Sequence, residues 1–247
     1  MANPGKNKLM RFMRLYVDGY NISGDARTFS SLGVSLGEVD MTGWSNTIRQ
    51  LLSDRRIDAA ISGFQAFFND TAASGSYPRL NNPQAGMEVM INFGGDAEPE
   101  NGDPSYMMAA QQMTSNISWD AQAGLINADF RIDSAVANAD NPLGYVLHGE
   151  TSLSATTLAP SINNGAASTN GWHAILQVIA SSGGTWVFKV RHSVDNSVWA
   201  DLGTFVLNGS VIGSEHIGGT GTVNQYVRFE ATRTSGTVTP VVSFARN

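Results

Sequence analysis

The chain has 247 residues, of which 42% are hydrophobic and 15% are charged, and its formal net charge is −6. The apolar share excludes a disordered chain, and the length allows one large domain or two ordinary ones. The absence of cysteine excludes disulfides, thiolate metal sites and cysteine nucleophiles. Because the usual charged share is about 25%, this surface is unusually neutral and costs little to desolvate against other protein.

Charge is unevenly placed along the chain. Residues 1–150 hold 10 Lys or Arg and 17 Asp or Glu, a charge of −7, and residues 151–247 hold 5 and 4, a charge of +1. An acidic part beside a nearly neutral one argues against nucleic-acid binding through a basic patch. Residues 1–17 are basic but lack an apolar h-region, and no run approaches about 18 apolar residues, so we expect neither a signal peptide nor membrane insertion.

Strand signals open the chain. Short strands are predicted over residues 14–18 and 29–36. The strongest signal covers residues 56–68, where side chains alternate and both faces are partly apolar, as in a central strand. Residues 70–85, rich in Ala, Ser, Asn and Pro, are predicted as a loop, and residues 87–93 as the next strand.

One helix is predicted between the second and third strands. Thr42 or Ser45 can cap it. Apolar residues follow at the helical spacing i, i+4, i+7 and i+8, at Trp44, Ile48, Leu51 and Leu52.

The remainder of the first part also alternates. Residues 106–119 are predicted to begin as a turn of helix over 106–110 and to continue as a strand. Residues 125–133 place apolar side chains at every second position, which predicts a strand with one buried face and one solvated face. A short strand is predicted at residues 144–149.

The composition changes after residue 150. Residues 151–170 are nearly free of charge and are predicted as a linker between two domains. Beyond it, short strands recur at the spacing of an all-β sandwich, over residues 172–179, 184–192, 199–207, 223–233 and 238–244. The predicted organisation of this mostly β chain is an arm at residues 1–12, a domain at 13–150, the linker, and a sandwich at 171–247.

No catalytic constellation stands out. His148, His173, His192 and His216 lack metal-ligand spacing, and no nucleotide-binding or nucleophile motif is present. Asp129 and Asp133 lie four apart on one predicted strand, about 13 Å, which does not fit the paired carboxylates of a glycosidase. The acidic loop at residues 96–103 lacks the EF-hand pattern, so a solvated loop is favoured over a calcium site. We therefore expect no enzymatic activity, no cofactor and no metal.

Aromatic residues of the second part allow a binding function. Exposed Trp172, Trp186 or Trp199 would suit stacking against carbohydrate. The neighbours of Trp186 and Trp199 favour core positions instead.

Several segments resemble the major tail tube protein of long-tailed, siphovirus-like bacteriophages. Residues 16–24 (YVDGYNISG) resemble its opening strand and turn, residues 38–52 its single helix, and residues 57–68 its long strand. Segments of the second part resemble the add-on, Ig-like β-sandwich modules of phage virion proteins, at residues 190–195, 199–203 and 226–229.

This resemblance implies a tail-tube-type β-sandwich or barrel with one α-helix, followed by a second all-β sandwich domain. It implies that six copies close into a ring and that rings stack into a virion tail tube, assembled in the host cytoplasm. DNA would pass through the tube without specific binding, and the tape measure and other tail proteins would be partners. The second sandwich would decorate the outside of the tube.

The same hypothesis names candidate residues. Polar positions of two strands would face the channel, namely Asp58, Ser62, Asn127, Asp129 and Asp133. The alternative is that these residues form a plain outer surface. The basic arm and the loop at residues 70–85 would supply contacts between rings, the basic residues being Lys6, Lys8, Arg11 and Arg14. The sequence leaves open another virion part, such as a capsid decoration or tail-tip protein, and a carbohydrate-binding adsorption module.

Overall fold

The computed structural model describes residues 12–40, 42, 48, 51–72, 74–120, 123–133 and 141–247, with the side chains of 36–40 and 51–56 left out. The first part of the chain consists mainly of strands: β1 (Met13–Val17), β2 (Tyr20–Asn21), β3 (Ala26–Thr28), β4 (Ser31–Asp40), β5 (Leu51–Phe67), β6 (Met87–Phe93), β7 (Pro104–Asp120), β8 (Ala123–Ile132) and β9 (Leu143–His148). One short helix, α1 (Ser76–Leu80), lies among them.

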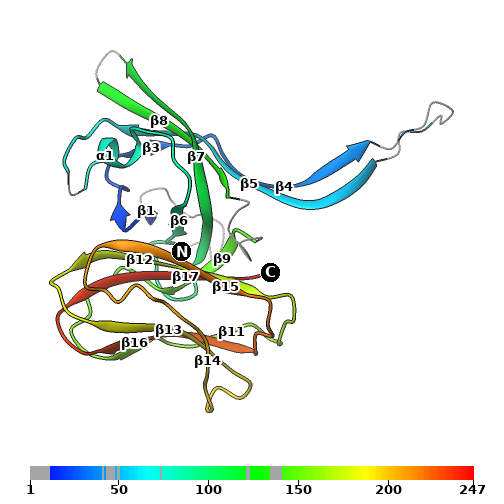
Figure 1. Cartoon of the computed structure of the whole chain (residues 1–247), viewed down its shortest axis with the longest axis vertical. Helices are drawn as coiled ribbons and strands as arrows, with labels where there is room; N and C mark the ends of the chain where they lie inside the picture. Colours follow the sequence, from blue (N-terminus) through cyan, green and yellow to red (C-terminus); the bar gives the residue numbers. More distant parts are fainter. Residues whose placement is uncertain are drawn as a thin grey trace.

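The rest of the chain is a β-sandwich (Figure 1). Its strands are β10 (Thr157–Leu158), β11 (Ile162–Asn163), β12 (Trp172–Ser181), β13 (Trp186–Ser193), β14 (Ala200–Thr204), β15 (Gly213–Gly219), β16 (Tyr226–Arg233) and β17 (Val238–Arg246). The mostly β fold class predicted from the sequence is confirmed.

Two sheets account for all of these strands. A five-stranded sheet has the order β10-β16-β13-β14, with β11 also paired to β16. A twelve-stranded sheet has the order β15-β12-β17-β9-β7-β6-β1-β2, and β8, β5, β4 and β3 branch from β7. The larger sheet passes from the first part of the chain to the second through β9, which pairs with both β7 and β17.

The sheets fold into four stacked layers, and the alternation of side chains sets their order. Inward residues of β5 and β8, such as Phe64 and Phe130, pack against Val89 of β6 in the N-terminal core. The sandwich core, with Trp186 and Phe188, lies between the β12–β17 layer and the five-stranded sheet. Figure 1 shows the sandwich below the first part of the chain, with β12, β17 and β15 turned toward it.

A third buried cluster, here called the seam, joins the two parts. It contains Tyr16, Met90 and Met107 from the first part and Ile175, Val241 and Ala245 from the second. Strands β1, β6 and β7 thus bury one set of side chains in the N-terminal core and the alternate set in the seam.

Polar groups of the seam are also paired across it. Gln177 of β12 is fully buried, and its Oε1 accepts a hydrogen bond from the Gly19 N–H at 2.5 Å. Its Nε2 donates to the Glu88 carbonyl at 2.9 Å. Because a buried side-chain amide is costly unless it is bonded, these two contacts fix the register between the parts.

The predicted helix after residue 40 is wrong in its C-terminal half. Leu51 and Leu52 belong to β5 and pair with Asp40 and Val39 of β4. Thr42 and Ile48 are not helical, while Trp44 and Ser45 lie outside the described residues. The helical spacing of these apolar residues is overridden by a long antiparallel ladder, a tertiary effect that local periodicity cannot show.

Two further predictions need correction. Residues 106–110 are strand from the first residue, and all five are buried, because β7 has packed layers on both faces and its apolar run imitates a buried helix. The segment 70–85 contains α1, which begins at Ser76, whose backbone N–H donates to the Asp25 carboxylate at 2.9 Å. This long-range bond has no signal in the local sequence.

The segment 151–170 is not free of structure. It contributes β10 and β11, which pair with β16 of the sandwich. The described residues contain no helix long and apolar enough to cross a membrane.

The close approach of Gly19 to Gly213 gives a stability test of the seam. Gly19 has φ +83°, and a Cβ added to it would lie 2.5 Å from the Gly213 nitrogen. We expect Gly19→Ala to lower the free energy of unfolding by roughly 2–5 kcal/mol, from left-handed strain plus overpacking. The control, Gly86→Ala, has φ +73° with nothing within 4 Å of the new Cβ, and should cost only about 1–2 kcal/mol. Equal losses in urea titrations would show that the two parts do not need this contact.

Glu88 places a largely buried carboxyl group beside the seam. Its Oε2 is buried and has no hydrogen-bond partner among the described residues. Burial raises the pKa of Glu88 to about 9, and the neighbouring carboxylates of Asp18, Asp133 and Glu215 add to the rise.

This raised pKa predicts a pH dependence of stability. The folded chain keeps the Glu88 proton up to a pH of about 9, whereas the unfolded chain loses it near 4.5. The free energy of unfolding therefore falls as pH rises across that window. Glu88→Gln stays neutral at every pH, so the variant should exceed the wild type at pH 8 by about 1–3 kcal/mol. Asp70→Asn, at an exposed carboxylate, is the control and should keep the pH dependence of the wild type. The measurement is the free energy of unfolding from chemical denaturation at several pH values. If Glu88→Gln also keeps the wild-type pH dependence, Glu88 is charged in the folded chain.

Candidate assembly surface

The β4–β5 ribbon is the most distinctive surface feature of the chain. Residues 60–67 of β5 pair with β8, whereas residues 51–58 have β4 as their only strand partner among the residues that the structure describes. This outer part projects from the body as a curved two-stranded ribbon (Figure 1). In the described part of the chain, β4 has no second strand partner, so one edge of a ten-residue strand is open.

The face of β5 and β8 turned away from the N-terminal core is polar. Ala59 and Ile61 of β5, and Ala128 and Phe130 of β8, are buried on the inward face. The alternate positions point outward, and the pairings Ala60 with Arg131 and Gln65 with Asn127 bring the two strands into one surface. This polar face contains Asp58, Ser62, Asn127, Asp129 and Arg131. Four of the five predicted channel residues are therefore brought together on one face.

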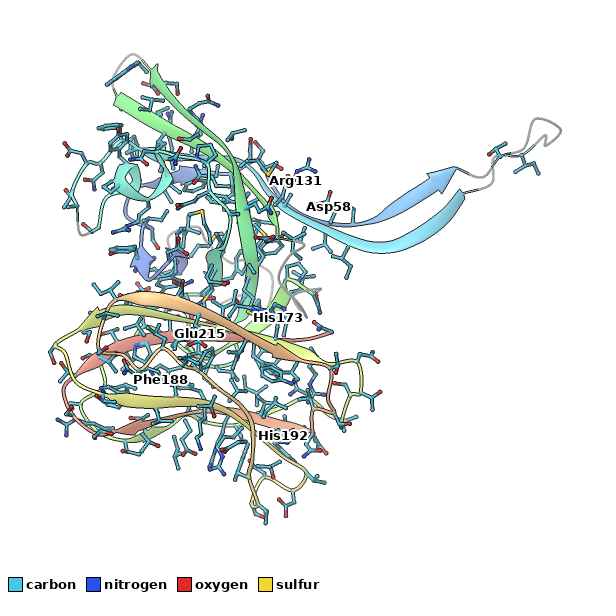
Figure 2. All side chains as sticks on the ribbon, viewed as in Figure 1. Asp58, Arg131, His173, Phe188, His192 and Glu215 are labelled. Atoms are coloured by element: carbon cyan, nitrogen blue, oxygen red, sulfur yellow. The ribbon has the colours of Figure 1, made fainter. Side chains whose placement is uncertain are left out.

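Hydrogen bonds and one ion pair hold the polar face in place. Asp58 lies 3.6 Å from the guanidinium of Arg131, and both side chains are exposed (Figure 2). Asp129 accepts hydrogen bonds from the Gly63 N–H at 2.6 Å and from the Thr114 hydroxyl at 3.1 Å. Since Gly63 lies at the register shift of β5, Asp129 stabilises the irregular backbone where the two strands meet.

The fifth predicted channel residue, Asp133, does not belong to this face. Its side chain is 4% exposed. Its carboxylate accepts hydrogen bonds from Gln111 Nε2 at 3.0 Å and from the Gly86 N–H at 3.3 Å. The prediction for Asp133 is wrong because β8 ends at Ile132, so the alternation that would turn residue 133 outward no longer applies.

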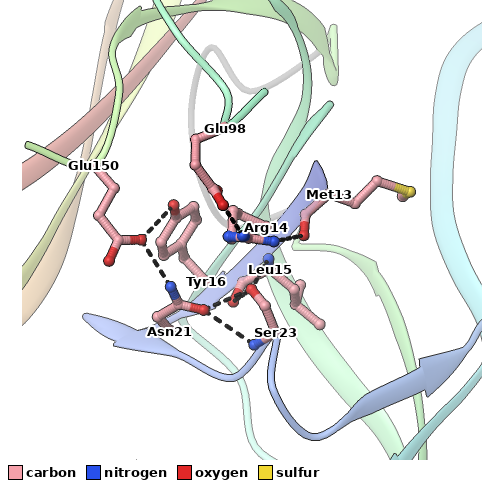
Figure 3. Close-up of polar contacts among 8 residues, drawn as sticks. All are labelled: Met13, Arg14, Leu15, Tyr16, Asn21, Ser23, Glu98 and Glu150. Carbon is pink, nitrogen blue, oxygen red and sulfur yellow. Dashed lines mark hydrogen bonds and ion pairs between the residues drawn. The ribbon is translucent and has the colours of Figure 1, made fainter. Parts of the chain in front are cut away.

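Most of the residues predicted to form contacts between rings cannot be placed. Lys6, Lys8 and Arg11 lie outside the described residues. Arg14 is in β1, where its guanidinium forms an ion pair with Glu98 and donates to the Met13 carbonyl at 2.9 Å (Figure 3). The charge of Arg14 is thus already engaged within its own chain.

The β7–β8 hairpin presents exposed apolar side chains that sequence reasoning missed. Met113, Ile117 and Trp119 are 49%, 48% and 77% exposed. The Trp119 ring is stacked near Phe68, with centroids 6.5 Å apart. Exposed aromatic residues of this kind are common anchors of protein interfaces. In the sequence these residues cannot be told from ordinary core positions of a strand.

The sandwich does not offer the tryptophan platform that would favour a carbohydrate site. Trp172 and Trp186 are 5% and 1% exposed, which confirms the core position predicted for Trp186. Trp199, for which a core position was also predicted, is only partly buried. The Arg228 guanidinium carbon lies 4.0 Å from its ring centroid, so one face of the ring is covered. This arrangement leaves little open aromatic surface in the sandwich.

Asp195 and His192, which lie three residues apart in sequence, both have structural roles. Asp195 accepts hydrogen bonds from the Ser197 and Val198 N–H groups, both at 2.9 Å, and so closes a turn. His192 Nδ1 accepts from the Asn224 N–H at 3.2 Å. Within the described ranges, no group of three His, Asp or Glu side chains could hold a metal ion.

Comparisons with known proteins identify no family for this chain. No family model and no curated protein matches the chain. Among solved structures, the Dit protein of phage SPP1 superposes over 95% of this chain and 99% of its own, with a TM-score of 0.32 and 9% identity. Its crystal structure is described as a paradigm of the hub adsorption apparatus in phages that infect Gram-positive bacteria. With so loose a superposition, this similarity assigns no function to the present chain.

Proposed function

We propose that this chain is a structural subunit of a phage tail, and that its copies close into rings that stack as a tube. The observation that carries this proposal is the β4–β5 ribbon. Among the described residues, residues 51–58 pair with β4 alone, and the outer edge of β4 is open. An isolated two-stranded ribbon is marginally stable in water, and an open edge invites pairing with another chain. Neighbouring copies in a closed ring would supply the missing contacts without leaving an edge for aggregation.

The layer order supports a tube with the polar face inside. Asp58, Ser62, Asn127 and Asp129 lie on the outermost surface of one end of the stack, and the sandwich lies at the opposite end. If that polar face lines a channel, the sandwich is necessarily on the outside. The one cation of this face, Arg131, is paired with Asp58, and Asp129 leaves the face net acidic, which would let DNA pass without binding.

Electron microscopy can distinguish a tube protein from other virion proteins by the assemblies that each forms. A tail-tip or capsid decoration protein would form single rings or no rings, whereas a tube protein polymerises. A carbohydrate-binding adsorption module is disfavoured by the burial of Trp172 and Trp186. Negative-stain electron microscopy of the concentrated protein therefore tests the proposal directly.

A charge placed on the ribbon should prevent assembly. Val34 of β4 lies at the base of the ribbon, opposite Ala59, and is 43% exposed, so Val34→Asp should leave the single chain folded. Repetition of that charge at every contact between copies should abolish rings and tubes, since like charges at an interface cost several kcal/mol. Val211→Asp, at a 60% exposed loop position of the sandwich, is the matched control. Normal tubes from Val34→Asp, with an unchanged melting temperature, would remove the ribbon from the assembly surface.

A cation on the polar face should make the channel bind DNA. Ser62 is partly exposed on β5, and Ser62→Lys would repeat a positive charge around each ring. We expect assembled variant tubes to retain DNA in co-sedimentation at low salt and to release it as salt rises. Ser154→Lys, at an exposed position of the sandwich, should bind less because its charges lie outside. Equal retention by both variants would argue against a polar face inside the tube.

A further inference from the structure

A groove lies between the 97–101 loop and the chain just after β9. Its volume is about 470 Å³, within the range of pockets that hold ligands, ~300–1,000 Å³. The floor is apolar and is formed by Pro99, Leu147, Ala159 and Pro160. The rim is acidic and is formed by Glu98, Glu100 and Glu150, all exposed.

Strand β1 already runs along this groove. Arg14 forms an ion pair with Glu98, and the Tyr16 hydroxyl donates to Glu150 at 3.0 Å (Figure 3). The Asn21 amide donates to the same Glu150 oxygen at 2.7 Å. Residues of the first hairpin therefore reach two of the three rim carboxylates.

The chain leaves the described structure at the end of the same groove. The Phe12 carbonyl accepts a hydrogen bond from the Gly94 N–H at 2.9 Å. The Ala97 carbonyl, at the start of the groove, lies against the same face of Gly94 as Phe12. The chain preceding Phe12 therefore begins beside the groove.

That preceding segment complements the groove in composition. Residues 1–11 carry three cations, Lys6, Lys8 and Arg11, and no acidic residue. Leu9 and Met10 lie between the cations. A segment of this kind suits an apolar floor with an acidic rim, since its side chains can bury apolar surface while the charges meet carboxylates.

We propose that the basic N-terminal segment, residues 1–11, binds in this groove of its own chain. Eleven residues can span up to about 36 Å, so the whole groove is within reach. The short connection also gives the segment an effective concentration in the millimolar range, which favours the same chain over another copy. The arm then has an intramolecular partner whether or not the chain assembles into rings.

Disulfide trapping in the full chain tests this proposal, because the chain has no native cysteine. The trapping pair is Asn7→Cys in the segment with Thr151→Cys on the groove. The control pair is Asn7→Cys with Thr232→Cys, another exposed threonine, on β16 of the sandwich. We expect the first pair to oxidise roughly tenfold faster than the control or more, within a single chain on a non-reducing gel. Mass spectrometry of the linked peptides identifies the bond.

The charge basis is tested in the same system. Raising the salt concentration and adding Glu100→Gln should each slow the first pair several-fold, because both weaken attraction at the rim. Bonds that join two chains would assign the groove to the arm of another copy and overturn the proposal. A rate equal to that of the control pair, or one insensitive to both salt and Glu100→Gln, would overturn it as well. None of these outcomes depends on tube formation.

Discussion

The architecture depends on one layer, strands β1, β6 and β7, that is buried on both faces. Leu15, Val89 and Met108 point into the N-terminal core, while the alternate residues Met90 and Met107 point into the seam. Full burial of an apolar side chain contributes about 1.5–3 kcal/mol. Because the same backbone serves both cores, neither part can shift without exposing apolar surface. The hydrogen bonds of Gln177 add a directional constraint to this packing.

The elements that could be predicted from sequence are those whose burial follows a simple period. Strand β6 was predicted with its observed bounds, and the alternation of β8 is matched by buried Ile126, Ala128 and Phe130. Strand β15 was missed, since Gly213–Gly219 has little apolar alternation and becomes a strand through its pairing with β12. The helix prediction around residue 50 is wrong for the opposite reason. Leu51 and Leu52 fit a helical period locally, but in the fold they pair with β4 as part of strand β5.

The candidate site shows the same limit. Alternation alone places Asn127 and Asp129 on one face of β8, but only the pairing of β8 with β5 adds Asp58 and Ser62 to that face. The burial of Asp133 depends on where β8 ends and on Gln111 and Gly86, which no local pattern indicates. The exposure of an apolar residue such as Trp119 is likewise a property of the folded sheet, because it depends on which tertiary neighbours cover the side chain, and the local sequence does not show these neighbours.

Rigidity of the seam has a consequence for any assembly of this chain. A sandwich tied by a flexible linker could take many positions around a ring, whereas this one shares a sheet with the first part through β9. In the proposed ring, contact of the β4–β5 ribbon with a neighbouring copy would therefore also fix the position of the sandwich. The polar face and the sandwich lie at opposite ends of the same stack of layers, with the N-terminal core and the seam between them. The inner and outer surfaces of a ring would thus be set by the packing of the single chain, before any contact between copies forms.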